Sequence, residues 1–206
     1  MLIYNYLFSL PNLLTFTRIS VIPVLVCVFY LPFTWAHSAA AILFIVASLT
    51  DWLDGFLARS LSQSTKLGAF LDPVADKLMV CVVLVVVAAE PYYQVIHLSS
   101  SRLVIPALFI TIPAAIIVSR EIIVSALREW MAELGKRASV KVSKWGKVKT
   151  TVQMLALTIL LYCNQNSNPL LILTGYILLY LAVILTISSM LLYLQAAWLE
   201  LHSRAC

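Results

Sequence analysis

The chain alternates between long apolar stretches and short polar segments over its whole length. Six of the apolar stretches approach the roughly 20 residues that a helix needs to cross a bilayer core of about 30 Å. Their ranges are Leu13–Leu31, Ala36–Ala58, Leu67–Ala89, Leu103–Leu127, Val148–Cys163 and Pro169–Trp198. The fifth is short, which indicates that its helix begins earlier, in the basic segment before it. Pro32, Pro91 and Pro169 lie at boundaries, where proline is often found.

This pattern predicts an all-α integral membrane protein with six transmembrane helices, organised as a single membrane domain over residues 1–206. The composition agrees, because 62% of the residues are hydrophobic and only 11% are charged, which is unusual for a soluble globular protein. The first nine residues could add a short interfacial helix. They contain no basic segment ahead of an apolar one, so we expect no cleaved signal peptide.

The basic residues predict the orientation of the chain. With six spans, the second and fourth connections share one side of the membrane with both termini, and the other connections lie on the opposite side. The first, third and fifth connections carry only Arg102. The second and fourth connections carry Arg59, Lys66, Arg128, Lys136, Arg137, Lys141, Lys144, Lys147 and Lys149. Because basic residues gather on the cytoplasmic side, we expect the side that includes both termini to face the cytoplasm.

Four of the nine acidic residues lie within one short window of this apolar chain. Asp51 and Asp54 are three residues apart near the end of the second span, and Asp72 and Asp76 are four apart near the start of the third. Helical geometry therefore places each pair on one face. The connection between the spans is short, so the helices are expected to be antiparallel neighbours whose carboxylates face each other.

Ordinary explanations do not account for these two pairs. None of the four aspartates has Lys or Arg three or four residues away, which argues against ion pairs within a helix. Solvation at a helix end could explain one acid but not two pairs on matching faces. Four close carboxylates repel one another unless cations lie between them. Mg²⁺ and Mn²⁺ prefer oxygen ligands, so the sequence predicts a site for divalent cations.

The spacing of the acidic window resembles that of a known family. It reads Asp51-x2-Asp54-Gly55-x2-Ala58-Arg59-x8-Gly68-x3-Asp72-x3-Asp76. With every fixed position filled, this is similar to the motif of the CDP-alcohol phosphatidyltransferases. The stretches "PNLLTFTR", "GAFLDPVADK", "REIIVSALREWMAELGKR" and "GKVKTT" resemble the bacterial members whose acceptor is glycerol 3-phosphate.

The resemblance implies an activity and a set of partners. The expected reaction transfers the phosphatidyl group of CDP-diacylglycerol to glycerol 3-phosphate and releases CMP at the cytoplasmic face. The family binds two divalent cations, Mg²⁺ or Mn²⁺, and is commonly a homodimer with six transmembrane helices. By position, Asp51, Asp54 and Asp72 would be metal ligands, and Asp76 both a ligand and the proton acceptor. The substrates and the lipid bilayer are the implied partners, and no nucleic acid is expected.

Other positions match the family's contacts with CDP-diacylglycerol. They are Asn12, Thr15, Arg18, Gly55, Ala58, Arg59 and Thr65. The small Gly55 and Ala58 would let the nucleotide approach the backbone, and Arg59 offers a guanidinium to a phosphate. Arg18 has a second interpretation, as an anchor at the membrane interface.

Arg120 predicts the acceptor site. It lies about 12 Å inside the inner end of the fourth span, where an arginine is costly and normally faces a polar cavity. The adjacent Glu121 is expected to point elsewhere and to be a poor neutralising partner. Arg120 and Lys149, supported by Lys147, would then hold the phosphate of the acceptor. Alternatively, the lysines serve only the orientation of the chain.

Two other functions stay open on the sequence. The same chemistry could use inositol phosphate, serine or phosphatidylglycerol as its acceptor. A cation transporter could instead use the acidic cluster as its ion site. Transporter sites usually lie near the middle of the bilayer between repeats, whereas these acids lie near one interface and no internal repeat is evident.

Overall fold

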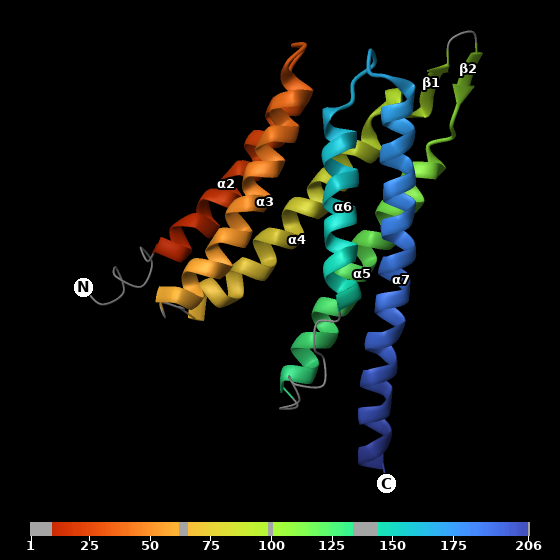
Figure 1. Cartoon of the computed structure of the whole chain (residues 1–206). Helices are drawn as coiled ribbons and strands as arrows, with labels where there is room; N and C mark the ends of the chain where they lie inside the picture. Colours follow the sequence, from red (N-terminus) through yellow and green to blue (C-terminus); the bar gives the residue numbers. More distant parts are fainter. Residues whose placement is uncertain (1–9, 62–65, 99–100, 134–143, 206) are drawn as a thin grey trace. The chain divides into compact units, whose positions relative to one another are not determined.

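The computed structural model of the chain describes residues 10–61, 66–98, 101–133 and 144–205, and within them the side chains of several helical segments, including 51–70, are not described. In this part of the chain there are six α-helices and one β-hairpin (Figure 1). The helices are α2 (Leu10–Phe29), α3 (Ala36–Leu61), α4 (Lys66–Ala89), α5 (Leu108–Glu133), α6 (Lys144–Tyr162) and α7 (Pro169–Ala205). The predicted interfacial helix in residues 1–9 lies outside the described residues.

The first of two compact units comprises Met1–Ala89 and Leu161–Ser167, and α2 is its central helix. Helix α2 packs against both α3 and α4. Leu25 and Phe29 of α2 are buried, as is the face of α3 that carries Ala36, Ala40 and Phe44. These α3 residues are four apart, so they share one face, and the two alanines allow a neighbouring helix to approach closely.

The second unit comprises Glu90–Leu160 and Asn168–Cys206. It begins with a short 3₁₀ helix, η1 (Pro91–Gln94), and an antiparallel hairpin of β1 (Val95–Leu98) and β2 (Ser101–Val104), in which Val95 is opposite Val104. Helix α5 then packs against α7.

The hairpin corrects the prediction that the fourth span begins at Leu103. Residues 101–104 form β2, and α5 begins only at Leu108. Pro106 explains the difference, because proline disfavours helical backbone in the residue before it. The first turn of α5 is anchored on that proline, since the amide of Phe109 donates to the carbonyl of Pro106 at 2.9 Å. The expectation that the fifth helix begins in the basic segment is confirmed, because α6 begins at Lys144.

Buried tyrosines satisfy backbone carbonyls within the second unit. The hydroxyl of Tyr93 donates to the carbonyl of Leu160 at 2.5 Å, and that of Tyr176 donates to the carbonyl of Tyr93 at 3.0 Å. Leu160 lies in the last turn of α6, where carbonyls have no partner within the helix. These bonds therefore tie η1 to the ends of α6 and α7.

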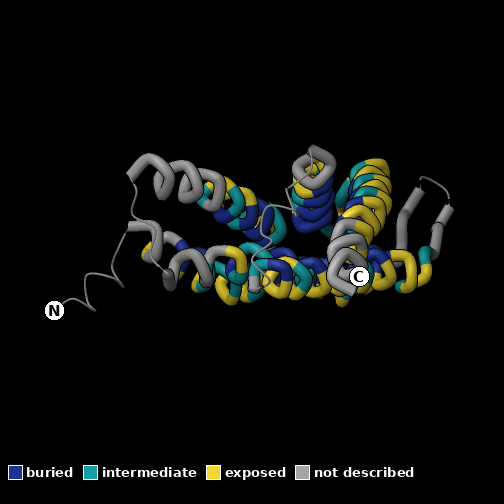
Figure 2. The backbone as a smooth tube through the Cα atoms, turned by 90° about the horizontal axis from the view of Figure 1, so that it is seen from below, coloured by how far each residue is buried: buried dark blue, intermediate teal, exposed yellow. Residues whose placement is uncertain are grey.

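The outer surfaces of the helices are apolar. Segments Leu108–Ala132 and Pro169–Gln195 are each long and apolar enough to cross a membrane, and Thr15–Phe29, Ala36–Thr50 and Val148–Tyr162 are shorter apolar helices. Exposed positions recur along the tubes in Figure 2. On α7 they include Leu170, Leu173, Ile177, Ile184 and Leu191. So much exposed aliphatic surface favours contact with lipid over contact with water.

Gly175 marks a close contact between α7 and α6. A Cβ atom at this position would lie 2.7 Å from Cδ2 and 2.9 Å from Cγ of Leu160, which is fully buried. Any larger residue must therefore push Leu160 aside.

We expect Gly175→Val to lower the free energy of unfolding by about 1–3 kcal/mol through overpacking. Thr174→Val is the matched control, because Thr174 is exposed on the same turn. Thermal unfolding of the two purified variants in detergent measures the difference. Equal melting temperatures would show that the contact with Leu160 does not constrain α7.

Candidate functional site

The acidic window lies on two consecutive helices of the first unit. Asp51 and Asp54 are in the last three turns of α3, and Asp72 and Asp76 are in the first three turns of α4. Because the backbone is helical at all four positions, each pair occupies one helical face, as predicted. Asp76 is half-buried. The other three side chains, and how the carboxylates meet, lie outside the described residues.

The donor atoms on these helices fit a hard divalent cation. All four side chains offer carboxylate oxygens, which are the ligands that Mg²⁺ and Mn²⁺ prefer. Pro73, inside α4, has no N–H to donate, so the carbonyl of Ala69 cannot accept the usual helical bond from it. That turn of α4 therefore lacks one of the usual helical hydrogen bonds.

The remaining motif positions are only partly described. Gly55, Ala58 and Arg59 lie on the last turns of α3, but their side chains are not described, and Thr65 lies outside the described residues. Asn12 lies in the first turn of α2 and its side chain is likewise not described.

Helix α2 buries two polar residues that the sequence predicted for the nucleotide. Thr15 and Arg18 are each 2% exposed and, three residues apart, share a face. An interfacial anchor would lie at the surface, so the burial of Arg18 argues against that interpretation.

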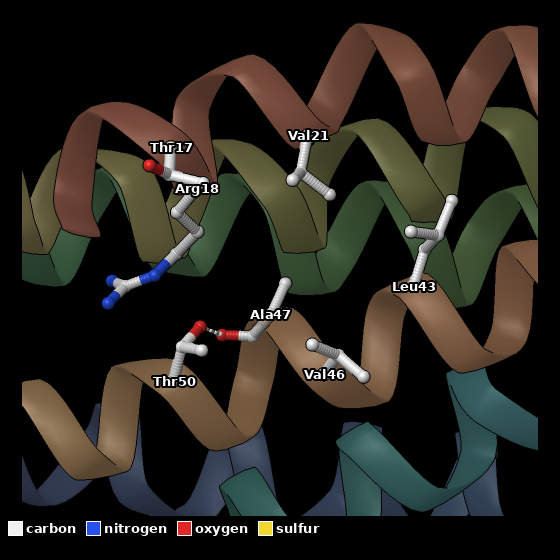
Figure 3. Close-up of a pocket in the computed structure, with 7 residues that line it drawn as sticks. All are labelled: Thr17, Arg18, Val21, Leu43, Val46, Ala47 and Thr50. Carbon is white, nitrogen blue, oxygen red and sulfur yellow. Dashed lines mark hydrogen bonds between the residues drawn. The ribbon is translucent and has the colours of Figure 1, made fainter. Parts of the chain in front are cut away.

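Arg18 borders a small cavity of about 80 Å³ between α2 and α3. The lining residues are Thr17, Arg18, Val21, Leu43, Val46, Ala47 and Thr50. Figure 3 shows the guanidinium group extending away from the apolar end of the cavity and toward the end where Thr50 lies. Asp51 follows Thr50 directly in the chain. The positive charge of Arg18 is thus directed toward the acidic end of α3.

The second unit contains a separate buried polar cluster on α5, α6 and α7. Arg120 Nη1 and Lys149 Nζ both donate to Oε1 of Glu121, at 3.1 and 2.5 Å. Arg120 Nη2 donates to Ser189 Oγ at 2.9 Å. Arg120 is 8% exposed, and Lys149 and Ser189 are 1% exposed. Arg120 and Lys149 therefore lie close together, as predicted, but the carboxylate of Glu121 lies between them.

Glu121 contradicts the expectation that it would point away from Arg120. Neighbouring residues on a helix project about 100° apart, and that angle led to the expectation. The glutamate side chain is long enough to curve back, and Lys149 approaches it from α6. This second cation reaches Glu121 only through a tertiary contact between two helices, so spacing within α5 could not have revealed it.

Tyr193 of α7 adds an aromatic surface to the arginines of α5. The guanidinium carbons of Arg120 and Arg128 lie 5.9 and 5.2 Å from its ring centroid, within range of a cation–π interaction. Arg128 Nη2 also donates to its hydroxyl oxygen at 3.0 Å. Sequence reasoning missed both Tyr193 and Ser189. Polar residues within the last apolar span were the available signal.

Arg120 has binding capacity left after these contacts. Its Nε is buried and has no hydrogen-bond partner among the described residues. A buried donor without a partner is unfavourable, and an anion at this position would satisfy it. Lys147, predicted as a supporting cation, lies in the first turn of α6, and its side chain is not described.

Comparisons with known proteins agree with the motif. A family model described as CDP-alcohol phosphatidyltransferase matches residues 8–188. A relative from Salmonella choleraesuis (strain SC-B67) is 52% identical over 190 residues, which cover 92% of this chain and 95% of the relative. Relatives from Escherichia coli (strain K12) and Shigella flexneri serotype 5b are 52% identical over 194 residues, covering 94% of this chain and 97% of each relative. All three are named CDP-diacylglycerol–glycerol-3-phosphate 3-phosphatidyltransferase.

The family match covers most of the chain and includes both acidic helices as well as Arg120, Glu121 and Lys149. Together with the relatives at 52% identity, it shows that the chain belongs to the CDP-alcohol phosphatidyltransferase family.

Proposed function

We propose that this protein transfers the phosphatidyl group of CDP-diacylglycerol to glycerol 3-phosphate, forming phosphatidylglycerol phosphate and CMP. The names and the high identity of the relatives support this reaction. The observation that carries the choice of acceptor is the buried pair of Arg120 and Lys149, with an unsatisfied donor on Arg120. The phosphate of a phosphorylated alcohol would pair with the two cations and accept a hydrogen bond from Arg120, whereas serine has no phosphate.

Asp51, Asp54, Asp72 and Asp76 would hold two divalent cations, Mg²⁺ or Mn²⁺. When bound, such ions neutralise the diphosphate of CDP-diacylglycerol and the charge that develops on the departing CMP. The oxygen-only donor set of α3 and α4 supports this assignment.

The side chains of the chain itself perform the remaining steps. Asp76 accepts the proton of the acceptor hydroxyl while that oxygen forms a bond to the phosphorus bearing the diacylglycerol, and the bond from that phosphorus to CMP breaks. Thr15 and Arg18 on α2 help to bind the nucleotide. Asn12, Gly55, Ala58, Arg59 and Thr65 complete the donor site. Arg120 and Lys149, with Lys147, hold the acceptor phosphate, so that positioning contributes much of the rate.

We further propose six transmembrane helices in a bacterial inner membrane, with both termini and the active site on the cytoplasmic side. The protein would act as a homodimer and as one membrane domain. The apolar surfaces of α5 and α7 and the distribution of the basic residues support this arrangement.

The reaction is tested by CMP release from CDP-diacylglycerol with purified protein and a panel of alcohols. We expect release with glycerol 3-phosphate and a divalent cation, and loss of release with a chelator.

Asp76→Asn should abolish turnover and leave the melting temperature close to that of the wild type, because asparagine keeps the shape but cannot accept the proton. A fully active Asp76→Asn enzyme would exclude this residue as the proton acceptor.

Asn substitutions at Asp51, Asp54 and Asp72 provide the comparison. They should act mainly through metal affinity, so excess Mn²⁺ should restore part of their activity but none of that of Asp76→Asn. Activity independent of metal in all of these variants would contradict the two-cation proposal.

The topology is tested by labelling single cysteines with an impermeant maleimide in intact cells. With the native cysteines replaced, a cysteine at position His97 should react from outside, and one at Ser139 only after the membrane is opened. Reaction of both from outside would contradict the proposed six spans.

Arg120→Ala should raise the KM for glycerol 3-phosphate by about ten- to a hundredfold, since a charge-assisted hydrogen bond contributes about 1.5–3 kcal/mol. The KM for CDP-diacylglycerol should change far less, and Lys149→Ala should act on the same parameter. Lys141→Ala, a change in the basic segment outside the described residues, is the control and should alter neither KM. If Arg120→Ala raises only the KM for CDP-diacylglycerol, Arg120 belongs to the CDP-diacylglycerol site.

A further inference from the structure

The carboxylate of Glu121 is the feature of the buried cluster to which the proposed reaction gives no role. One oxygen atom, Oε1, accepts hydrogen bonds from Arg120 on α5 and from Lys149 on α6. We propose that Glu121 is a positioning residue that holds these two cations in the geometry required to bind the acceptor phosphate. This inference rests on the proposed function, because it concerns the same acceptor.

The cluster requires a carboxylate for an electrostatic reason. Lys149 is almost fully buried and Arg120 is nearly so, and two buried positive charges repel each other. Because both bind the same oxygen of Glu121, the carboxylate offsets the repulsion and brings the two cationic groups to a common point. Without its charge, we expect the two side chains to separate and the phosphate site to lose its shape.

The hydrogen bonds of Arg120 favour positioning over competition with the phosphate. A guanidinium group has five N–H donors in a rigid plane. Glu121 accepts from Nη1, Ser189 accepts from Nη2, and Nε has no partner among the described residues. Glu121 therefore orients Arg120 without occupying all the N–H donors of the guanidinium group. A carboxylate that mimicked the phosphate would be expected to take the remaining donor as well.

Ser189 fixes the other side of the same guanidinium. Its hydroxyl donates to the carbonyl of Thr186 at 3.0 Å, so the oxygen is oriented to accept from Arg120. Arg120 is thus held between its own helix and α7, and Lys149 donates to the same carboxylate from α6.

Glu121→Gln tests the inference, because glutamine keeps the size of the side chain and removes its charge. We expect the KM for glycerol 3-phosphate to rise about tenfold, which corresponds to about 1.4 kcal/mol. The KM for CDP-diacylglycerol should stay within about twofold of the wild-type value. Both are measured by CMP release from the purified full-length protein in detergent, together with the melting temperature.

Glu121→Asp and Glu129→Gln serve as comparison variants. Aspartate keeps the charge on a shorter side chain, so its KM for glycerol 3-phosphate should lie between those of the wild type and Glu121→Gln. Glu129 is exposed on the same helix, and its substitution should change neither KM. Should Glu121→Gln not fold, a KM of Glu121→Asp for glycerol 3-phosphate above the wild-type value supports the inference, and an unchanged KM overturns it.

The outcomes separate this inference from the proposed function. Wild-type protein that releases no CMP with glycerol 3-phosphate would contradict the function itself. If the wild type is active and Arg120→Ala raises the acceptor KM but Glu121→Gln does not, the acceptor site stands and the inference fails. A lower KM in Glu121→Gln would show that the carboxylate competes with the phosphate. A lower melting temperature with both KM values unchanged would show a purely structural role.

Discussion

The stability of the second unit depends on the neutralisation of positive charges that are buried in its apolar interior. Arg120 and Lys149 are buried on two helices whose other surfaces are largely aliphatic, and an unpaired charge in such a place would be strongly destabilising. Glu121 binds both cations, and Ser189 binds Arg120 from α7. Three helices are thereby joined through one polar cluster, and their relative rotation is constrained, because each must direct a particular side chain inward.

In the proposed function, the same cluster connects stability with binding of the acceptor phosphate. A site that was fully neutralised by the protein would have little affinity for a phosphate. A site that was not neutralised at all would be costly to bury. One carboxylate between two cations leaves a net positive charge and an unsatisfied donor on Arg120. The cluster can therefore form in the folded protein and still attract an anion.

The first unit handles its polar groups differently. Its acidic residues lie near the ends of α3 and α4, while Thr15 and Arg18 are buried on the central helix α2. The small cavity beside Arg18 has a mainly apolar lining that includes Val21 and Leu43, and the guanidinium group of Arg18 extends away from these residues (Figure 3).

Much of the helical architecture was predictable from the sequence. Apolar runs and proline positions placed most helix boundaries within a few residues, because a helix in an apolar environment must satisfy its own backbone. Two helices extend further than predicted, since α5 ends at Glu133 rather than Leu127 and α7 at Ala205 rather than Trp198. The start of α5 was wrong, since residues 101–104 form a strand and Pro106 delays the helix. A short apolar stretch can form either a strand or a helix, so the hydrophobic pattern alone could not show that residues 101–104 form a strand.

The sequence by itself determined the family, the acidic motif and the residues with unusual chemistry, because fixed spacing on a helix is a local property. Only the tertiary structure decided how those residues are paired. Glu121 and Lys149 are 28 positions apart, and Arg120 and Ser189 are 69 apart, so no local pattern connects them. Their contacts arise from the packing of α5 against its neighbours, and in an apolar interior that packing determines which charges are neutralised.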